Sequence, residues 1–153
     1  MFTQKVSDIL SALLIFLFLY TGLSKLVEHA RFISQLRESP WKLLADNSSW
    51  FTWALPIGEV LICILLIIPK YRKLGFWFSG LLLVAFEIYL TALVTSGKHL
   101  PCSCGGIIKY LTWTQHIFFN MAFLIISIWG IYTEKRLNKK DIPLNDFNIS
   151  LAE

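Results

Sequence analysis

Two of the three cysteines lie one residue apart, in the stretch Pro101-Cys102-Ser103-Cys104-Gly105-Gly106. A Cys-x-Cys pair can close into a small, strained disulfide ring, and strained disulfides are reduced more easily than structural ones. The two glycines add backbone freedom and leave the sulfurs uncovered. The pair therefore indicates thiol–disulfide exchange, against the alternative of a surface turn with idle cysteines or one static bridge. A metal site is not expected, because zinc ligands usually have wider spacings and further Cys or His partners.

The composition indicates an integral membrane protein. Of 153 residues, 56% are hydrophobic and only 16% are charged, a combination that is unusual for a soluble domain. The net charge of +4 comes from basic residues beside apolar runs. Lipid head groups explain this distribution better than nucleic acid does, so we expect a bilayer and no nucleic acid as partner.

Four apolar runs are each long enough to cross a hydrocarbon layer of roughly 30 Å. They cover about 7–27, 50–68, 74–96 and 113–132. The turn between the second and third is short, so these two spans must be antiparallel. The sequence thus predicts an all-α, four-transmembrane-helix bundle as one membrane domain, 1–133, followed by a polar tail, 134–153, without strong periodicity.

The segment between the first two spans predicts an interfacial helix. Phe32, Ile33 and Leu36 fall on one helical face, and the helix should end at Ser39-Pro40. The opposite face is polar and carries Arg31, Ser34, Gln35 and Glu38.

The basic residues predict the orientation. Four spans put both termini on one side, where eight basic residues lie packed against span ends, compared with six on the other side. The positive-inside rule then places the termini and the tail in the cytoplasm. In a bacterial inner membrane the cysteine loop would face the periplasm, where disulfides persist.

Five polar side chains in or beside the spans require an explanation, since such groups are costly in lipid unless they face the bundle interior. They are Lys25, Glu59, Glu87, His116 and Asn120. The predicted topology places Lys25 and His116 at the membrane level of the cysteine loop, with Glu87 and Asn120 a turn or more below. These residues could therefore form one site with Cys102 and Cys104.

Four of the five side chains also have a simpler explanation. Lys25 could extend to the head groups, and His116 could hydrogen-bond a neighbouring helix. The two glutamates could be interhelical hydrogen-bond groups. However, His116 lies in the first turn of the fourth span, where the positive helix end favours a neutral ring that can accept a proton.

The pattern resembles the MauE branch of the DoxX-like membrane proteins, which are small four-span bundles. The matching features lie between about residues 5 and 133. They are Gly22-Leu23-Ser24-Lys25-Leu26, the loop from Phe32 to Pro40, the Pro56–Glu59 segment, and Pro101-Cys102-Ser103-Cys104-Gly105-Gly106 followed by Trp113, His116 and Asn120. The resemblance implies thiol–disulfide traffic with a periplasmic thioredoxin-like partner. In methylamine utilisation, the family member is needed to mature the disulfide-rich small subunit of methylamine dehydrogenase.

The leading interpretation is a membrane thiol–disulfide oxidoreductase. Cys102 and Cys104 would exchange with the partner, His116 would accept the thiol proton and Lys25 would stabilise the thiolate. Glu87 and Asn120, with Glu59, would support this site. The alternative is a non-catalytic scaffold for client maturation, and a small proton-coupled transporter is a weaker third interpretation. The client, the direction of electron flow and the oligomeric state stay open.

No haem, flavin or iron–sulfur ligand set is evident in the sequence. A membrane quinone could be the electron carrier, because several aromatic residues lie near Glu87, but the aromatic residues of a span more often face lipid or pack against neighbouring helices. The aromatic residues near Glu87 are Phe76, Trp77, Phe78, Phe86 and Tyr89.

Overall fold

The computed structural model describes residues 2–39, 41–95 and 113–149, and every regular element in these ranges is a helix. Four helices are long and apolar enough to cross a membrane. They are α1 (Phe2–Val27), α4 (Ser48–Ile67), α5 (Arg72–Thr95) and α6 (Trp113–Ile149). The predicted all-α, four-span membrane bundle is confirmed.

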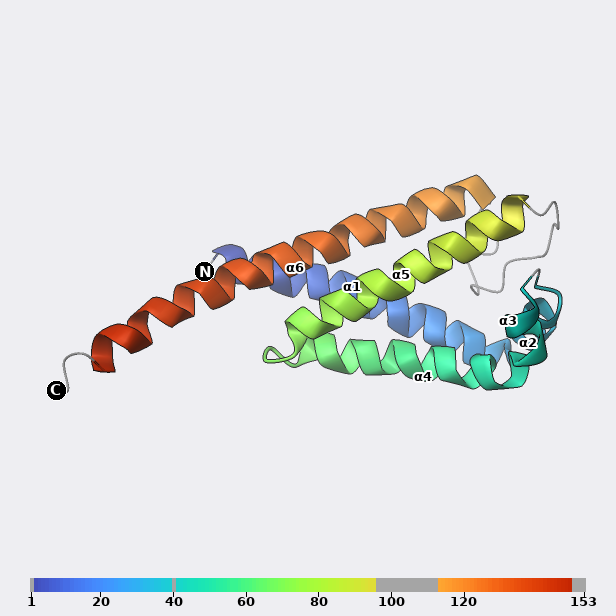
Figure 1. Cartoon of the computed structure of the whole chain (residues 1–153), viewed down its shortest axis with the longest axis horizontal. Helices are drawn as coiled ribbons and strands as arrows, with labels where there is room; N and C mark the ends of the chain where they lie inside the picture. Colours follow the sequence, from blue (N-terminus) through green and yellow to red (C-terminus); the bar gives the residue numbers. More distant parts are fainter. Residues whose placement is uncertain (1, 40, 96–112, 150–153) are drawn as a thin grey trace.

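The four long helices lie alongside one another in one bundle (Figure 1), and their contacts form a ring. The most extensive contacts join α5 to α6 and α1 to α4, and α1 with α6 and α4 with α5 complete the ring. A turn of four residues joins α4 to α5, with the amide of Tyr71 donating to the Ile68 carbonyl at 3.0 Å. The antiparallel arrangement of these two helices follows from that tight connection.

Small residues set how closely the helices approach. A Cβ atom on Gly130 of α6 would lie 2.2 Å from the Phe76 ring of α5, and one on Gly75 would lie 2.9 Å from the backbone of Leu66. Ser127 donates a hydrogen bond of 2.7 Å to the Phe76 carbonyl. Such contacts replace the hydrophobic force that helices lack inside a lipid layer.

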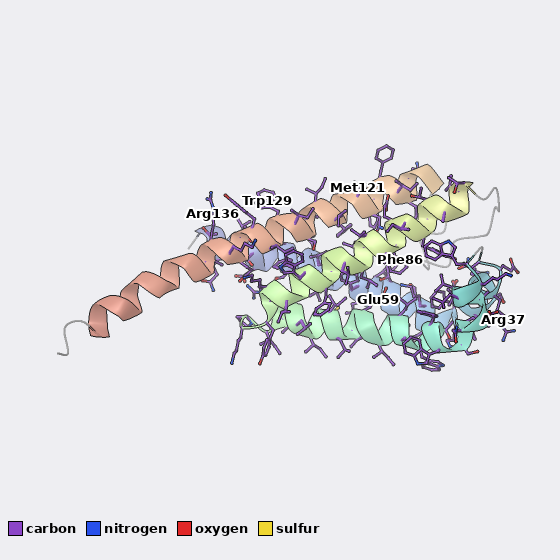
Figure 2. All side chains as sticks on the ribbon, viewed as in Figure 1. Arg37, Glu59, Phe86, Met121, Trp129 and Arg136 are labelled. Carbon is purple, nitrogen blue, oxygen red and sulfur yellow. The ribbon has the colours of Figure 1, made fainter. Side chains whose placement is uncertain are left out.

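Apolar side chains cover both the inside and the outside of the bundle. The shared core comes from α1, α4 and α5 and consists of Leu10, Leu14, Leu17, Phe18, Ile62, Cys63, Leu66, Phe76 and Leu83. Large apolar groups also point outward, among them Met121 and Trp129 (Figure 2). A helix that is apolar on all sides is typical of a membrane span.

Two short helices lie between the first two spans. α2 (His29–Arg37) buries Phe32 and Leu36 and exposes Arg31, so the predicted amphipathic helix is confirmed. α3 (Lys42–Asp46) follows it and was not predicted. Both pack against α4 at the end where that helix begins.

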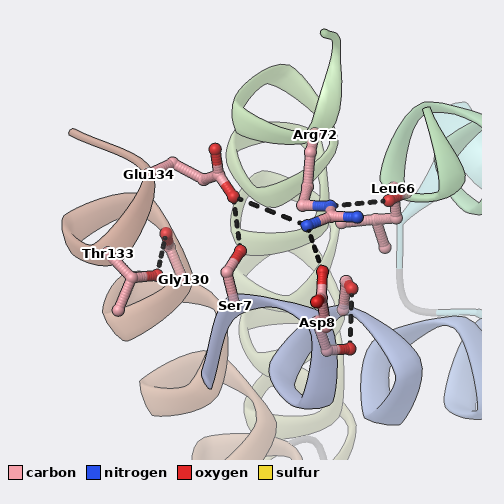
Figure 3. Close-up of polar contacts among 8 residues, drawn as sticks. Ser7, Asp8, Leu66, Arg72, Gly130, Thr133 and Glu134 are labelled. Atoms are coloured by element: carbon pink, nitrogen blue, oxygen red, sulfur yellow. Dashed lines mark hydrogen bonds and ion pairs between the residues drawn. The ribbon is translucent and has the colours of Figure 1, made fainter. Parts of the chain in front are cut away.

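A polar network ties the helices together at the other end of the bundle (Figure 3). We call Ser7, Asp8, Arg72 and Glu134 the Arg72 cluster. The Arg72 guanidinium contacts Asp8 at 2.6 Å and Glu134 at 3.9 Å, and its Nε donates to the Leu66 carbonyl at 3.2 Å. The Ser7 hydroxyl donates to Glu134. The cluster thus joins α1, α5, α6 and the end of α4.

The last helix runs beyond the predicted fourth span. The sequence predicted a span that ends near residue 132, followed by a polar tail without strong periodicity, and in the structure α6 continues as a helix to Ile149 (Figure 1). Glu134 keeps α6 attached to the bundle at this point. The residues that follow include the good helix formers Lys135, Arg136 and Leu137, which explains why the helix does not stop at the apolar boundary.

Candidate functional site

Lys25 and Glu59 form an ion pair inside the bundle. The Lys25 Nζ lies 2.5 Å from the Glu59 Oε1, and the two side chains are 3% and 0% exposed. Lys25 therefore does not extend to the bundle surface, and the head-group explanation for it is wrong. Although Lys25 lies near the end of α1, its ammonium group is paired with the Glu59 carboxylate on α4, the next span.

Three neighbours on α1 and α5 shape the surroundings of this pair. The Thr21 hydroxyl donates to Glu59 Oε1 at 3.3 Å, and the Lys25 Nζ lies 4.8 Å from the centre of the Phe86 ring. A Cβ atom on Gly22 would lie only 3.0 Å from Glu59 Oε2. The missing side chain at Gly22 is thus what leaves room for the carboxylate. Additional partners of this kind are needed if the attraction within a buried ion pair is to offset the loss of hydration.

A second polar contact lies between α5 and α6. Asn120 Nδ2 donates to Glu87 Oε2 at 3.0 Å and to the Leu83 carbonyl at 3.2 Å. The sequence placed Glu87 and Asn120 at a similar depth, and the structure joins them directly. This contact fixes the amide of Asn120 beside the ion pair of the first two spans.

One cavity brings most of these groups together. It has a volume of about 40 Å³, and its polar lining includes Lys25, Glu59, His116 and Asn120. Figure 2 shows Glu59 and Phe86, which also lines the cavity, inside the bundle. His116 is 5% exposed and is held in the first turn of α6. Polar residues from three different helices therefore line one cavity, whose lining is otherwise mostly apolar.

The predicted cysteine pair, Cys102 and Cys104, lies outside the described residues. The chain segment that carries it is bounded by Thr95 at the end of α5 and Trp113 at the start of α6. His116 follows that boundary within one helical turn. The third cysteine, Cys63, is buried in the core and does not line the cavity.

A larger, almost entirely apolar pocket adjoins this cavity. Its volume is about 190 Å³, and Phe86 borders both spaces. The pocket is lined by Phe32, Leu36, Trp41, Leu44, Phe51, Leu55, Leu82, Ala85, Phe86 and Tyr89. Of the five aromatic residues considered for a quinone, only Phe86 and Tyr89 belong to it. Phe76 is fully buried in the core, and Trp77 and Phe78 are about half exposed.

The sequence interpretation missed Thr21, Gly22 and the position of Phe86 beside Lys25. A usable signal was present on α1, because Thr21 and Lys25 are four residues apart and so share a helical face. No comparable signal pointed to Phe86. Within the described ranges, no group of three His, Cys, Asp or Glu side chains could hold a metal ion.

Comparisons with known proteins give one match. No curated protein and no solved structure matches the chain. A family model described as methylamine utilisation protein MauE matches residues 3–133. Because that match covers most of the chain, the protein belongs to the MauE family of membrane proteins, which is associated with methylamine utilisation.

Proposed function

We propose that this protein is a membrane-embedded thiol–disulfide relay. It exchanges electrons with a periplasmic thioredoxin-like protein and so aids the maturation of periplasmic proteins that contain disulfides or cofactors. The observation that carries the proposal is the cavity that joins Lys25 to His116. His116 lies in the first turn after the segment with the two cysteines, so a base and a cation are held at the end of the bundle to which that segment is anchored.

The exchange step would conserve electrons and protons. One thiolate of the Cys102/Cys104 pair attacks a sulfur of the partner disulfide, whose S–S bond breaks as a mixed disulfide forms. The second cysteine then attacks the mixed disulfide and releases the partner as a dithiol. Two electrons pass from this protein to the partner, and two protons leave the cysteine pair. Electron flow in the opposite direction uses the same steps in reverse.

His116 and Lys25 would make this step fast at neutral pH. The thiolate is the attacking species, so a group that accepts the thiol proton and a nearby cation both increase its population. His116 is the proton acceptor in this proposal, and the Lys25 ammonium stabilises the anion. Glu59 holds the Lys25 side chain inside the bundle, and Glu87 holds Asn120 beside it.

The redox state of the cysteine pair tests the proposal most directly. Thiol alkylation and mass analysis across glutathione buffers should show a reversible two-electron couple between about −120 and −270 mV. Cys102→Ser with Cys104→Ser should abolish both the couple and client maturation, while Cys63→Ser should leave both unchanged. If the double serine variant still supports its client, the protein is instead a non-catalytic scaffold.

His116 can be tested separately. His116→Ala should slow thiol exchange by roughly 10²-fold at neutral pH, the usual contribution of a general base. His29 of α2 is the matched control, because its ring contacts the Trp53 ring at a centroid distance of 4.9 Å and it does not line the cavity. An unchanged pH–rate profile in His116→Ala would remove this residue from the mechanism.

The membrane side of the relay needs its own electron carrier, and we propose a quinone in the apolar pocket. Two electrons and two protons convert a quinone to a quinol, which matches one disulfide. The aromatic walls and the border at Phe86 with the Lys25 cavity support this placement. Purified protein should retain quinone, and Ala85→Trp, which fills the pocket, should lose it. Wild-type protein that neither carries nor reduces quinone would refute this part.

The orientation belongs to the same proposal. The termini would lie in the cytoplasm of a bacterial inner membrane and the cysteine loop in the periplasm, as the basic residues indicate. A reporter fused to the C-terminus that is active only in the cytoplasm tests this. Activity of a periplasm-specific reporter at that position would reverse the orientation.

A further inference from the structure

Glu59 has one carboxylate oxygen that the ion pair does not use. Lys25 and Thr21 both donate to Oε1, at 2.5 and 3.3 Å. Oε2 is buried and has no hydrogen-bond partner among the described residues. Glu59 itself is 0% exposed. A buried polar atom without a partner is rare in folded proteins, and an ordered water is the usual explanation when there is room for one.

The cavity beside Glu59 has the size and the lining for water. Its volume of about 40 Å³ exceeds the roughly 10–15 Å³ that one water requires. A buried water also needs about two to four polar partners, which Lys25, Glu59, His116 and Asn120 can supply. An aromatic ring or an acyl chain is too large for the same space. The small volume and these four polar side chains, set in an otherwise mostly apolar lining, together select water as the occupant.

We propose that this cavity holds water that carries protons between His116 and the free Oε2 of Glu59, so that Glu59 is a proton acceptor within the membrane. The use of that proton in thiol exchange rests on the proposed function, whereas the water site and the protonation of Glu59 do not. A proton released to His116 moves through the water to Oε2. The net charge of the groups around the cavity stays the same during this transfer.

The groups that face Glu59 fit such a transfer. From α1 come the Lys25 ammonium and the Thr21 hydroxyl, and from α6 come His116 and Asn120. α5 contributes Glu87, which reaches the cavity through Asn120. On α4 itself, Cys63 lies one turn further along. Lys25 supplies the counter-charge that lets Glu59 lose a proton in a medium of low dielectric constant.

Infrared difference spectroscopy tests this proposal without measuring activity. Protein reconstituted in lipid is perfused with buffers of alternating pH, and the carbonyl stretch of protonated carboxyl groups is recorded. We expect a band that is absent in Glu59→Gln and that shifts when H₂O is replaced by D₂O. A spectrum that is identical in wild type and Glu59→Gln would overturn the proposal, as would a Glu59 band that does not shift in D₂O.

Further variants test whether the infrared band comes from Glu59 and from its Oε2 atom. Lys25→Gln combined with Glu59→Gln removes both charges, so it should fold even if Glu59→Gln alone does not, and it should also lack the band. Gly22→Ala places a methyl group against Oε2 and should displace the band, whereas Gly58→Ala, whose Cβ meets nothing within 4 Å, should leave it unchanged. An unshifted band in Gly22→Ala would contradict the assignment to Oε2.

The double variant Cys102→Ser with Cys104→Ser separates this inference from the proposed function. The Glu59 band should persist in that variant, because the water site does not require the cysteines. Loss of thiol exchange with retention of the band would leave the proton site intact. Loss of the band in that variant would refute a proton site that is independent of the cysteines.

Discussion

Two ion-pair clusters fasten α1 to its neighbours, one near each end of that helix, and they differ in burial and in unused hydrogen-bonding capacity. The Lys25 and Glu59 side chains are 3% and 0% exposed, while those of Arg72 and Asp8 in the Arg72 cluster are 11% and 52% exposed. Arg72 uses its guanidinium on Asp8, Glu134 and a backbone carbonyl. Glu59 has one carboxylate oxygen without a hydrogen-bond partner, and the residue also lines a cavity.

This difference indicates that the Arg72 cluster is structural, whereas the Lys25–Glu59 pair is suited to a chemical role. Exposed ion pairs contribute about 0–1 kcal/mol to the free energy of unfolding. The polar groups of the Arg72 cluster contact one another and so join the ends of the helices. A buried pair is weak evidence for stability, since apolar residues of similar volume often stabilise as well or better. The Lys25–Glu59 pair therefore needs a reason other than stability, and the adjoining cavity with His116 provides one.

Breaking the buried pair should give the largest loss of stability. Glu59→Ala leaves an unpaired ammonium among apolar groups, and we expect it to lower the free energy of unfolding by about 3–5 kcal/mol. Lys25→Met combined with Glu59→Leu should lose much less, because no buried charge remains. Unfolding in mixed micelles measures both variants. A double variant whose loss equals the sum of the losses of Lys25→Met alone and Glu59→Leu alone would contradict the ion pair.

Placing a methyl group against the Glu59 carboxylate should cause the next largest loss of stability. Gly22→Ala brings a methyl group to 3.0 Å from Glu59 Oε2, and overpacking of this kind costs about 1–3 kcal/mol. Gly58→Ala is the matched control on α4, where the added methyl meets open space. The same unfolding assay applies. Equal stabilities for the two alanine variants would mean that Oε2 does not lie against Gly22.

Mutations in the Arg72 cluster should lower the free energy of unfolding by a smaller amount. Arg72→Ala removes a partly exposed ion pair and one hydrogen bond to Leu66, so we expect a loss of about 1 kcal/mol. Lys70→Ala, which removes an exposed positive charge from the same turn, should change stability by less than about 0.5 kcal/mol. A loss for Arg72→Ala as large as that for Glu59→Ala would end the distinction between the two clusters.

Salt should produce the smallest effect and should act on one cluster only. Double-mutant cycles for Arg72–Asp8 should show coupling of about 0.2–1 kcal/mol at low salt and less at 1 M salt, where the Debye length falls to about 3 Å. The coupling between Lys25 and Glu59 should not change, because ions do not reach a buried pair. Equal salt dependence of the two couplings would place Lys25 in contact with solvent.

The spans and the interfacial helix could be predicted because their signals are local. A long apolar run forms a span in lipid regardless of its neighbours, and Phe32 with Leu36 marks one face of α2 from the sequence alone. α3 is too short to show a periodic signal, and the contact of Glu134 on α6 with Ser7 on α1 joins residues 127 positions apart. Both features needed tertiary information.

The pairing within the candidate site was harder to predict for the same reason. Lys25, Glu59, His116 and Asn120 were selected from the sequence because polar side chains in spans are energetically costly in lipid. That criterion does not say which of them contact one another. Which of them meet depends on the rotation and depth of each helix, and these are set by packing details such as the missing side chain at Gly22. Lys25 at a helix end looked free to reach the head groups, yet Glu59 lies within its reach inside the bundle.

The Lys25–Glu59 contact also affects how the chain enters the membrane during synthesis. The two residues are 34 positions apart, so at about 5–20 residues per second the ribosome needs roughly 2–7 s to add the second after the first. During that interval the first span carries an ammonium group without the carboxylate that it contacts in the folded bundle. The first two spans are therefore expected to leave the insertion machinery as a helical hairpin, and the later spans are then added to a charge-neutral pair.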